Sequence, residues 1–97
     1  MVKWGFVYTL GDVAAPPRRD VLGSDACQLI CVGIPTPEGA AEAARALLEE
    51  GVELIELCGA FAAPGLASVL AQVEGQVPVG AVFYGGEAAP ALHRLFG

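Results

Sequence analysis

Four runs of apolar residues, separated by turn residues, have the length and composition of β-strands. They cover residues 4–10, 26–34, 52–58 and 77–84. The second run has a continuously apolar centre, which is typical of a strand buried on both faces of a parallel sheet. The pattern therefore predicts four strands with mostly parallel pairing.

Helical spacing of apolar residues follows each of the last three predicted strands. Thr36 is a good N-cap, and Pro37 suits the first helical position, where its missing N–H breaks no bond. The helix that they open ends at Gly51, a typical C-terminal stop. We expect a second helix over residues 64–75 and a short third helix over about residues 87–96. The expected packing faces are Ala40, Ala43, Ala44, Leu47 and Leu48 in the first helix, Leu66, Val69, Leu70 and Val73 in the second, and Leu92, Leu95 and Phe96 in the third.

The alternation of strands and helices predicts right-handed crossovers and a mostly parallel sheet. We expect a single small α/β domain over residues 1–97, with a four-stranded sheet in the order 2-1-3-4 and helices packed on it in a flavodoxin-like or Rossmann-like topology. Residues 13–25 are expected to form an irregular linker, in which Pro16 and Pro17 could open a short helical turn over residues 18–22. The direction of the first strand is left open, because this linker is only just long enough for a crossover.

Composition adds an expectation about assembly. Hydrophobic residues make up 55% of the 97 residues, and a domain of this size buries only roughly 60–65% of its unfolded surface. The apolar excess predicts a homo-oligomer, either a dimer or a larger assembly. A net charge of −6 with only five basic residues makes nucleic acid and anionic membrane surfaces poor partners, because both require clustered Lys and Arg.

The apolar runs and the cysteines suggest a compartment. No run approaches the ~20 residues that span a bilayer, and the first residues lack a signal-peptide pattern. A cytoplasmic protein with three free cysteines is therefore expected. Cys27 and Cys31 are four residues apart in one predicted strand, a span of roughly 13 Å, so they suit neither a shared metal ion nor a disulfide. Both are expected in the core, and neither a metal site nor a cofactor is predicted.

A ligand site is expected at the ends of the predicted strands, because open parallel sheets bind ligands beyond the carboxyl ends of their strands. Each of these ends contains glycine, which either makes a plain turn or lets the backbone approach a ligand closely. Residues 59–65 lead into a predicted helix whose first N–H groups could hold a phosphate or carboxylate, although they match neither a Walker nor a dinucleotide-binding motif. Phe61 and Tyr84 are candidate pocket walls. The candidate ligand-binding residues are Gly11, Thr36, Gly59, Ala60, Phe61, Tyr84 and Gly85.

Glu56 and Cys58 are the candidate catalytic residues, since both fall on one face of the third predicted strand. A carboxylate in a central strand needs a partner or a cleft. Glu56 is therefore either a general acid/base or ligand anchor, or a carboxylate that accepts bonds from a loop, Arg18 or Arg19. Cys58 precedes a predicted helix N-terminus, which favours a thiolate nucleophile, but a small buried side chain is the alternative. His93, the only histidine, is expected at the surface or in an oligomer contact.

Two segments resemble a family of small bacterial proteins of unknown function, DUF6506. They are the Glu-Leu-Ile-Glu-Leu-Cys-Gly-Ala-Phe of residues 53–61 and the Val-Pro-Val-Gly of residues 77–80. The resemblance covers the C-terminal two thirds of the chain and implies a shared fold in which Glu56, Cys58 and Gly59 act as a unit, with no known activity. Ala60 stands where the family pattern implies a second glycine, which weakens the case for close backbone approach there.

Three functions fit these observations. The first is a binding module for a polar or anionic small molecule at the strand ends. The second is a small enzyme that uses Glu56 as acid/base, with or without Cys58 as nucleophile. The third is an oligomeric scaffold whose apolar excess forms an interface. We rank them in this order.

Overall fold

The computed structural model describes all of residues 1–97 as a single α/β domain. Three short 3₁₀ turns each lead into one of the three α-helices. The elements are β1 (Val2–Thr9), β2 (Arg18–Gly23), β3 (Cys27–Ile34), η1 (Pro37–Gly39), α1 (Ala40–Glu49), β4 (Ile55–Leu57), η2 (Gly59–Phe61), α2 (Ala62–Val73), β5 (Val79–Ala81), η3 (Gly86–Ala88) and α3 (Ala89–Phe96).

The sheet has five strands in the order β2-β3-β1-β4-β5, so the expected number of four is wrong. The order of the whole sheet differs from the expected one because β2 is added at the edge, while the four expected strands keep the expected order, as β3-β1-β4-β5. β1, β3, β4 and β5 run parallel, and β2 pairs antiparallel with β3 at one edge. Residues 18–22, expected as linker or helical turn, lie in β2. Charged side chains and the preceding Pro16-Pro17 hide this strand in the sequence, and both features are common at exposed sheet edges.

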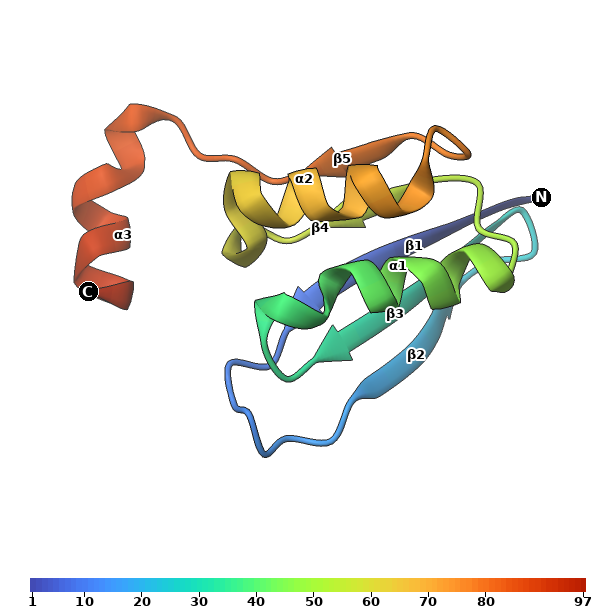
Figure 1. Cartoon of the computed structure of the whole chain (residues 1–97), viewed down its shortest axis with the longest axis horizontal. Coiled ribbons are helices and arrows are strands. Elements are labelled where there is room, and N and C mark those ends of the chain that lie inside the picture. Colours follow the sequence, from blue (N-terminus) through green and yellow to red (C-terminus); the bar gives the residue numbers. More distant parts are fainter.

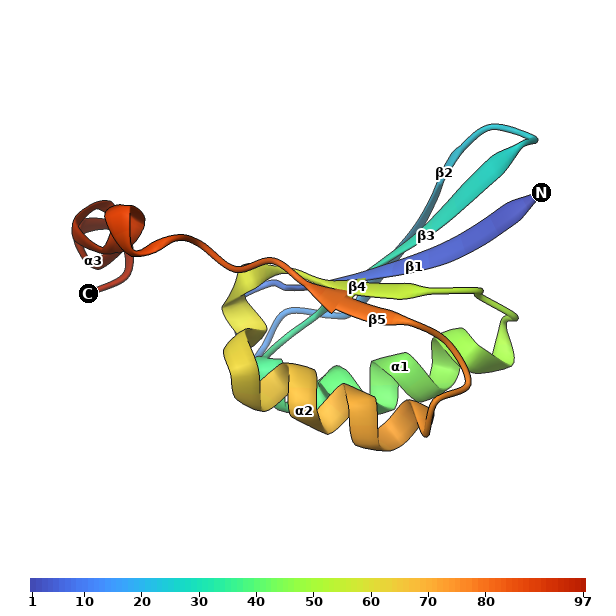
Figure 2. The ribbon, with the colours of Figure 1, turned by 90° about the horizontal axis from the view of Figure 1, so that it is seen from above.

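Both long helices, α1 and α2, lie on the same face of the sheet, and the other face carries no helix (Figure 2). A flavodoxin-like sheet has helices on both faces, so that part of the expected topology is wrong. The connections explain the difference. The chain moves in one direction across the sheet from β3 through α1 to β4 and from β4 through α2 to β5, and right-handed crossovers in one direction place both helices on one face. The return step, from β1 to β3, runs through β2 instead of a helix.

The core lies between the sheet and these two helices. The α1 face expected from the sequence is confirmed for Ala40, Ala43, Ala44 and Leu47, which are all buried. In α2 only Val69 and Val73 are buried, and Leu70 is 47% exposed because it lies at the rim of the helix–sheet contact. The largest fully buried side chains are Val7, Ile30, Leu47, Ile55, Leu57, Val69 and Val73.

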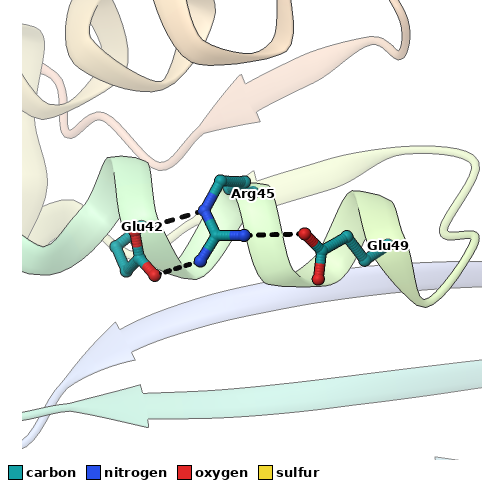
Figure 3. Close-up of polar contacts among 3 residues, drawn as sticks. All are labelled: Glu42, Arg45 and Glu49. Atoms are coloured by element: carbon teal, nitrogen blue, oxygen red, sulfur yellow. Dashed lines mark hydrogen bonds and ion pairs between the residues drawn. The ribbon is translucent and has the colours of Figure 1, made fainter.

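The ends of α1 show how local sequence sets the helix. Thr36 is extended and makes no side-chain cap, so the chain enters α1 through the turn η1 that begins at Pro37. Gly51 has φ +84°, a left-handed conformation that glycine adopts without strain, and the predicted stop is confirmed. On the outer face, Arg45 bonds both Glu42 and Glu49 (Figure 3). The hydrogen bond from Arg45, and then its positive charge, lower the pKa of Glu42. Both ion pairs are exposed and contribute little stability.

The bare sheet face changes the expected burial of the cysteines. Cys27 is exposed and Cys31 is half-buried, so the expectation that both lie in the core is wrong. Successive side chains along a strand point to opposite faces of the sheet. Cys27 and Cys31 are three residues and one residue away from Ile30, which is fully buried under the helices. The two cysteines therefore face the uncovered side. All three cysteines are free thiols.

α3 stands apart from the rest of the domain (Figure 1). Residues 82–85 lead away from β5 without regular structure, and no residue of α3 is buried. Leu95 and Phe96, expected to pack, are 72% and 83% exposed. No helix in the structure is both long enough and apolar enough to cross a membrane.

Candidate functional site

A cavity of about 830 Å³ opens at the carboxyl ends of β1 and β4, between these strand ends and α3. The strand ends and turn η2 form its floor. The outer wall consists of α3 and of Tyr84, which lies in the segment of residues 82–85 between β5 and η3. The lining residues are Thr9, Cys58, Gly59, Ala60, Tyr84, Leu92, His93, Phe96 and Gly97.

Hydrogen bonds at the strand ends fix the floor of this cavity. The Cys58 N–H donates to the carbonyl of Val7 on β1 at 3.0 Å, which holds the end of β4 against β1. The Thr9 hydroxyl donates to the carbonyl of Pro35 (3.4 Å) and accepts the N–H of Gly11 (3.1 Å). The floor is therefore tied to β1 and to the end of β3, independently of the position of α3.

Turn η2 begins at the floor of the cavity. The first N–H groups of a helical segment lack acceptors within it, and here these groups belong to Gly59 and Ala60, which both line the cavity. Ala62 then has φ +52°, an unfavourable conformation for a residue with a Cβ. A Cβ added at Gly59 would lie 3.1 Å from the ring of Tyr84, so the absence of a side chain lets Tyr84 lie close over the turn.

The structure brings together four of the residues expected at the site, Cys58, Gly59, Ala60 and Tyr84. The other five candidates, Glu56 among them, do not line the cavity. Phe61 is 3% exposed and packs in the core below η2. Gly11 makes an exposed turn with φ +68°, while Thr36 and Gly85 each precede a 3₁₀ turn.

Glu56 does not share this cavity. It is exposed on the bare sheet face and lines a separate, shallow hollow of about 360 Å³ beside β5. It pairs with neither Arg18 nor Arg19, which bond Asp20 and Glu50 respectively. The expectation that a carboxylate in this strand cannot be freely solvated is wrong, because no helix covers that face.

Five lining residues were not among the candidates from the sequence: Thr9, Leu92, His93, Phe96 and Gly97. Thr9 lies in the end of the first strand, residues 9–12, which is one of the strand ends where a ligand site was expected. The others lie on α3 and at its end, and the sequence does not show where that short helix sits. His93 thus lines the same cavity as Cys58. No group of three or more His, Cys, Asp or Glu side chains is placed to hold a metal ion.

On the bare sheet face, burial and then the Asp20 carboxylate raise the pKa of the Cys31 thiol. A raised pKa leaves less thiolate at any given pH, so alkylation of Cys31 should accelerate only as pH rises above the usual range for a thiol. Asp20→Asn should move this rate profile partway toward lower pH, because burial remains. Residue-resolved mass spectrometry of iodoacetamide labelling tests this, with Asp25→Asn as a charge-matched control. An unchanged Cys31 profile in Asp20→Asn would exclude the electrostatic contribution.

Comparison with known proteins gives a family and no function. The model of a family of unknown function, DUF6506, matches residues 2–97. This match extends the resemblance from the C-terminal two thirds to nearly the whole chain. No curated protein and no solved structure shows a significant match.

Proposed function

Because the chain belongs to the DUF6506 family, whose function is unknown, we propose a function from the cavity itself. The protein is a binding module for a small molecule that carries an anionic group and an apolar part. The ligand lies at the carboxyl ends of β1 and β4, with its anionic group toward turn η2. The cavity at this place is the observation that carries the proposal.

The size and walls of the cavity support a small-molecule ligand. Its volume of about 830 Å³ falls within the range of roughly 300–1,000 Å³ that is typical of ligand pockets. Ala60, Leu92 and Phe96 give it apolar surface, and a few polar groups lie among them. Ligand pockets commonly combine an apolar lining with a small number of polar groups that orient the ligand.

The polar groups favour an anion over a cation. The lining includes Gly59 and Ala60 at the start of η2, together with Tyr84 and His93, and each of these residues has a group that is able to donate a hydrogen bond. None of the lining residues is an Asp or a Glu, although the chain has eleven of them. Backbone donors at the start of a helical segment stabilise a carboxylate or phosphate placed against them.

Thermal unfolding with three probes tests this proposal. Benzoate combines a carboxylate with an apolar ring, benzylamine has the same ring with a positive charge, and inorganic phosphate lacks the ring. At ten times its Kd, a bound ligand adds about 1.4 kcal/mol, which raises Tm by roughly 6–11 °C in a domain of this size. We expect benzoate to raise Tm more than phosphate and benzylamine to leave it unchanged. Equal shifts with benzoate and benzylamine would contradict an anion site.

A glycine variant assigns any such shift to this cavity. In Gly59→Val the new Cβ would lie 3.1 Å from the Tyr84 ring and 3.4 Å from the Val82 carbonyl, and its methyl groups would occupy space at the floor. We expect the variant to fold and to lose the benzoate shift. Gly86→Val is the matched control, because no atom lies within 4 Å of a Cβ at Gly86. A full benzoate shift in Gly59→Val would place the ligand elsewhere.

A second candidate is an enzyme that uses Cys58 as nucleophile, because Cys58 and His93 line the same cavity. A thiol is activated when an imidazole accepts its proton. Glu56 takes no part in this version, because it lies outside the cavity. The labelling measurement described for Cys31 also reads Cys58. Fast labelling of Cys58 that slows in His93→Gln supports the pairing, and protection of Cys58 until the protein unfolds excludes it.

A further inference from the structure

The sheet face opposite α1 and α2 is an uncovered apolar surface centred on β1. Gly5 and Val7 are buried under the helices, and side chains alternate along a strand, so Trp4, Phe6 and Tyr8 point to the bare side. The Tyr8 ring lies over the neighbouring strand, where a Cβ at Gly33 would be 2.6 Å from it. We call this surface the open face. Its apolar side chains are Trp4, Phe6, Tyr8, Leu22, Leu29 and Cys31.

An open face of this kind is unusual for parallel strands, which are almost always covered on both sides. β1 and β3 have eight residues each, β2 has six, and β4 and β5 have three each, which gives a flat area of roughly 440 Å² at ~3.3 Å per residue and ~4.8 Å per strand. A stable interface takes about 800 Å² of accessible surface per partner. The strands of the open face alone fall short of this area, so a stable dimer needs the outer side of α3 as well.

α3 has an apolar side that its own chain does not cover. Its inner side, with Leu92, His93 and Phe96, lines the cavity. At helical spacing, Ala91, Arg94 and Leu95 lie on the outer side, and Leu95 is 72% exposed. α3 lies beyond the strand ends, away from the open face of its own sheet (Figures 1 and 2).

Two unpaired charges distinguish these surfaces. Glu56 is exposed on the open face, level with Phe6, and makes no ion pair. Arg94 is the one arginine without a carboxylate partner, since Arg18, Arg19 and Arg45 all have one. A carboxylate on one uncovered surface and a guanidinium on the other are complementary.

We propose that two copies of this chain form a symmetric dimer in which the outer side of α3 of each copy packs on the open face of the other. Arg94 of each copy pairs with Glu56 of the other. The contact is isologous, as expected for a two-fold dimer. It also holds α3 in place as the outer wall of the cavity. The dimer does not depend on the nature of the ligand, so it stands even if the anion site fails.

Sedimentation velocity and Trp4 fluorescence test the dimer. Trp4 is the only tryptophan and lies on the open face, so its emission should shift to the red as dilution separates the copies. Arg94→Glu and Glu56→Arg should each weaken the dimer by at least about tenfold, because each places like charges together. Glu49→Arg, which reverses a charge on the outer face of α1, is the matched control and should leave the dimer unchanged.

Mixing the two variants separates a contact between chains from one within a chain. If the contact joins two copies, a mixture of Glu56→Arg and Arg94→Glu forms a heterodimer in which both pairs are opposite in sign, and the dimer returns. If the contact lay within one chain, only the double variant would be restored. Recovery in the mixture supports the proposal. A monomer at every soluble concentration, a dimer indifferent to both substitutions, or recovery in the double variant alone would overturn it.

Discussion

Leu47→Ala is expected to lower the free energy of unfolding by about 2–5 kcal/mol. The Leu47 side chain is fully buried where α1 crosses the sheet. It sits directly over Gly5 of β1, because a Cβ at Gly5 would lie 2.7 Å from Leu47 Cδ1. Removing its methyl groups leaves a cavity that neighbouring strands cannot close. A domain of this length has a total stability of only about 5–15 kcal/mol, so the loss is a large fraction of the whole.

Because Gly5 has no side chain and lies against Leu47, the effects of substitutions at Gly5 and Leu47 on stability should be strongly coupled. Gly5→Ala alone forces Leu47 to move and is expected to cost about 1–3 kcal/mol through overpacking. In the double variant, the new methyl group occupies part of the space that Leu47 vacates. The double variant should therefore lose less stability than the sum of the two single changes, by about 1 kcal/mol or more.

Urea unfolding of the four proteins of this cycle gives the coupling directly. Leu70→Ala is the matched control, because it removes the same atoms from a side chain that is 47% exposed on α2, and it should cost less than about 1.5 kcal/mol. Additive effects at Gly5 and Leu47 would show that the two do not share one packing space, and that α1 does not approach β1 as closely as described.

The same α1 shows what the sequence is able to predict. Ala and Leu at helical spacing, a proline at the start and a glycine at the stop act within a few residues of each other, so local interactions alone define this helix. The parallel strands were also predictable, because their apolar runs are bounded by turn residues. The side of the sheet on which each helix lies could not be predicted from the same signals. It depends on the direction of each crossover, and the sequence pattern over residues 18–23 does not reveal β2.

The presence of β2 between β1 and β3 in the chain explains most of the differences between the expected and the observed candidate site. With a helix between β1 and β3, the sheet would be covered on both faces, Glu56 would be shielded and the cysteines buried. With β2 in that place, Glu56 and Cys31 lie on an open face. The structure brings the expected residues Cys58, Gly59, Ala60 and Tyr84 together in one region. The contribution of α3 could not be predicted, because no residue of α3 is buried and its apolar residues therefore do not indicate where the helix lies.

The turn between β2 and β3 depends on one glycine, Gly23. Gly23→Ala is expected to lower the free energy of unfolding by about 3 kcal/mol. Gly23 has φ +111°, a conformation that a residue with a Cβ rarely adopts. A Cβ there would also lie 2.2 Å from the carbonyl oxygen of Cys27, which is backbone. That carbonyl accepts the N–H of Ser24 at 2.9 Å and so closes the hairpin. The clash can be relieved only by opening the turn.

Gly11→Ala separates the two contributions, because Gly11 has φ +68° but no atom within 4 Å of a Cβ. Gly11→Ala should lower the free energy of unfolding only by the conformational penalty, about 1–2 kcal/mol.

Hydrogen exchange measured along β2 tests the local effect of Gly23→Ala. In Gly23→Ala, the amides of β2 that pair with β3 should lose protection while those of β1 and β4 keep theirs, since β2 is an edge strand and the other four form the parallel sheet. If protection fell equally in all five strands, β2 would be part of the cooperative core, and the parallel sheet would not stand without it.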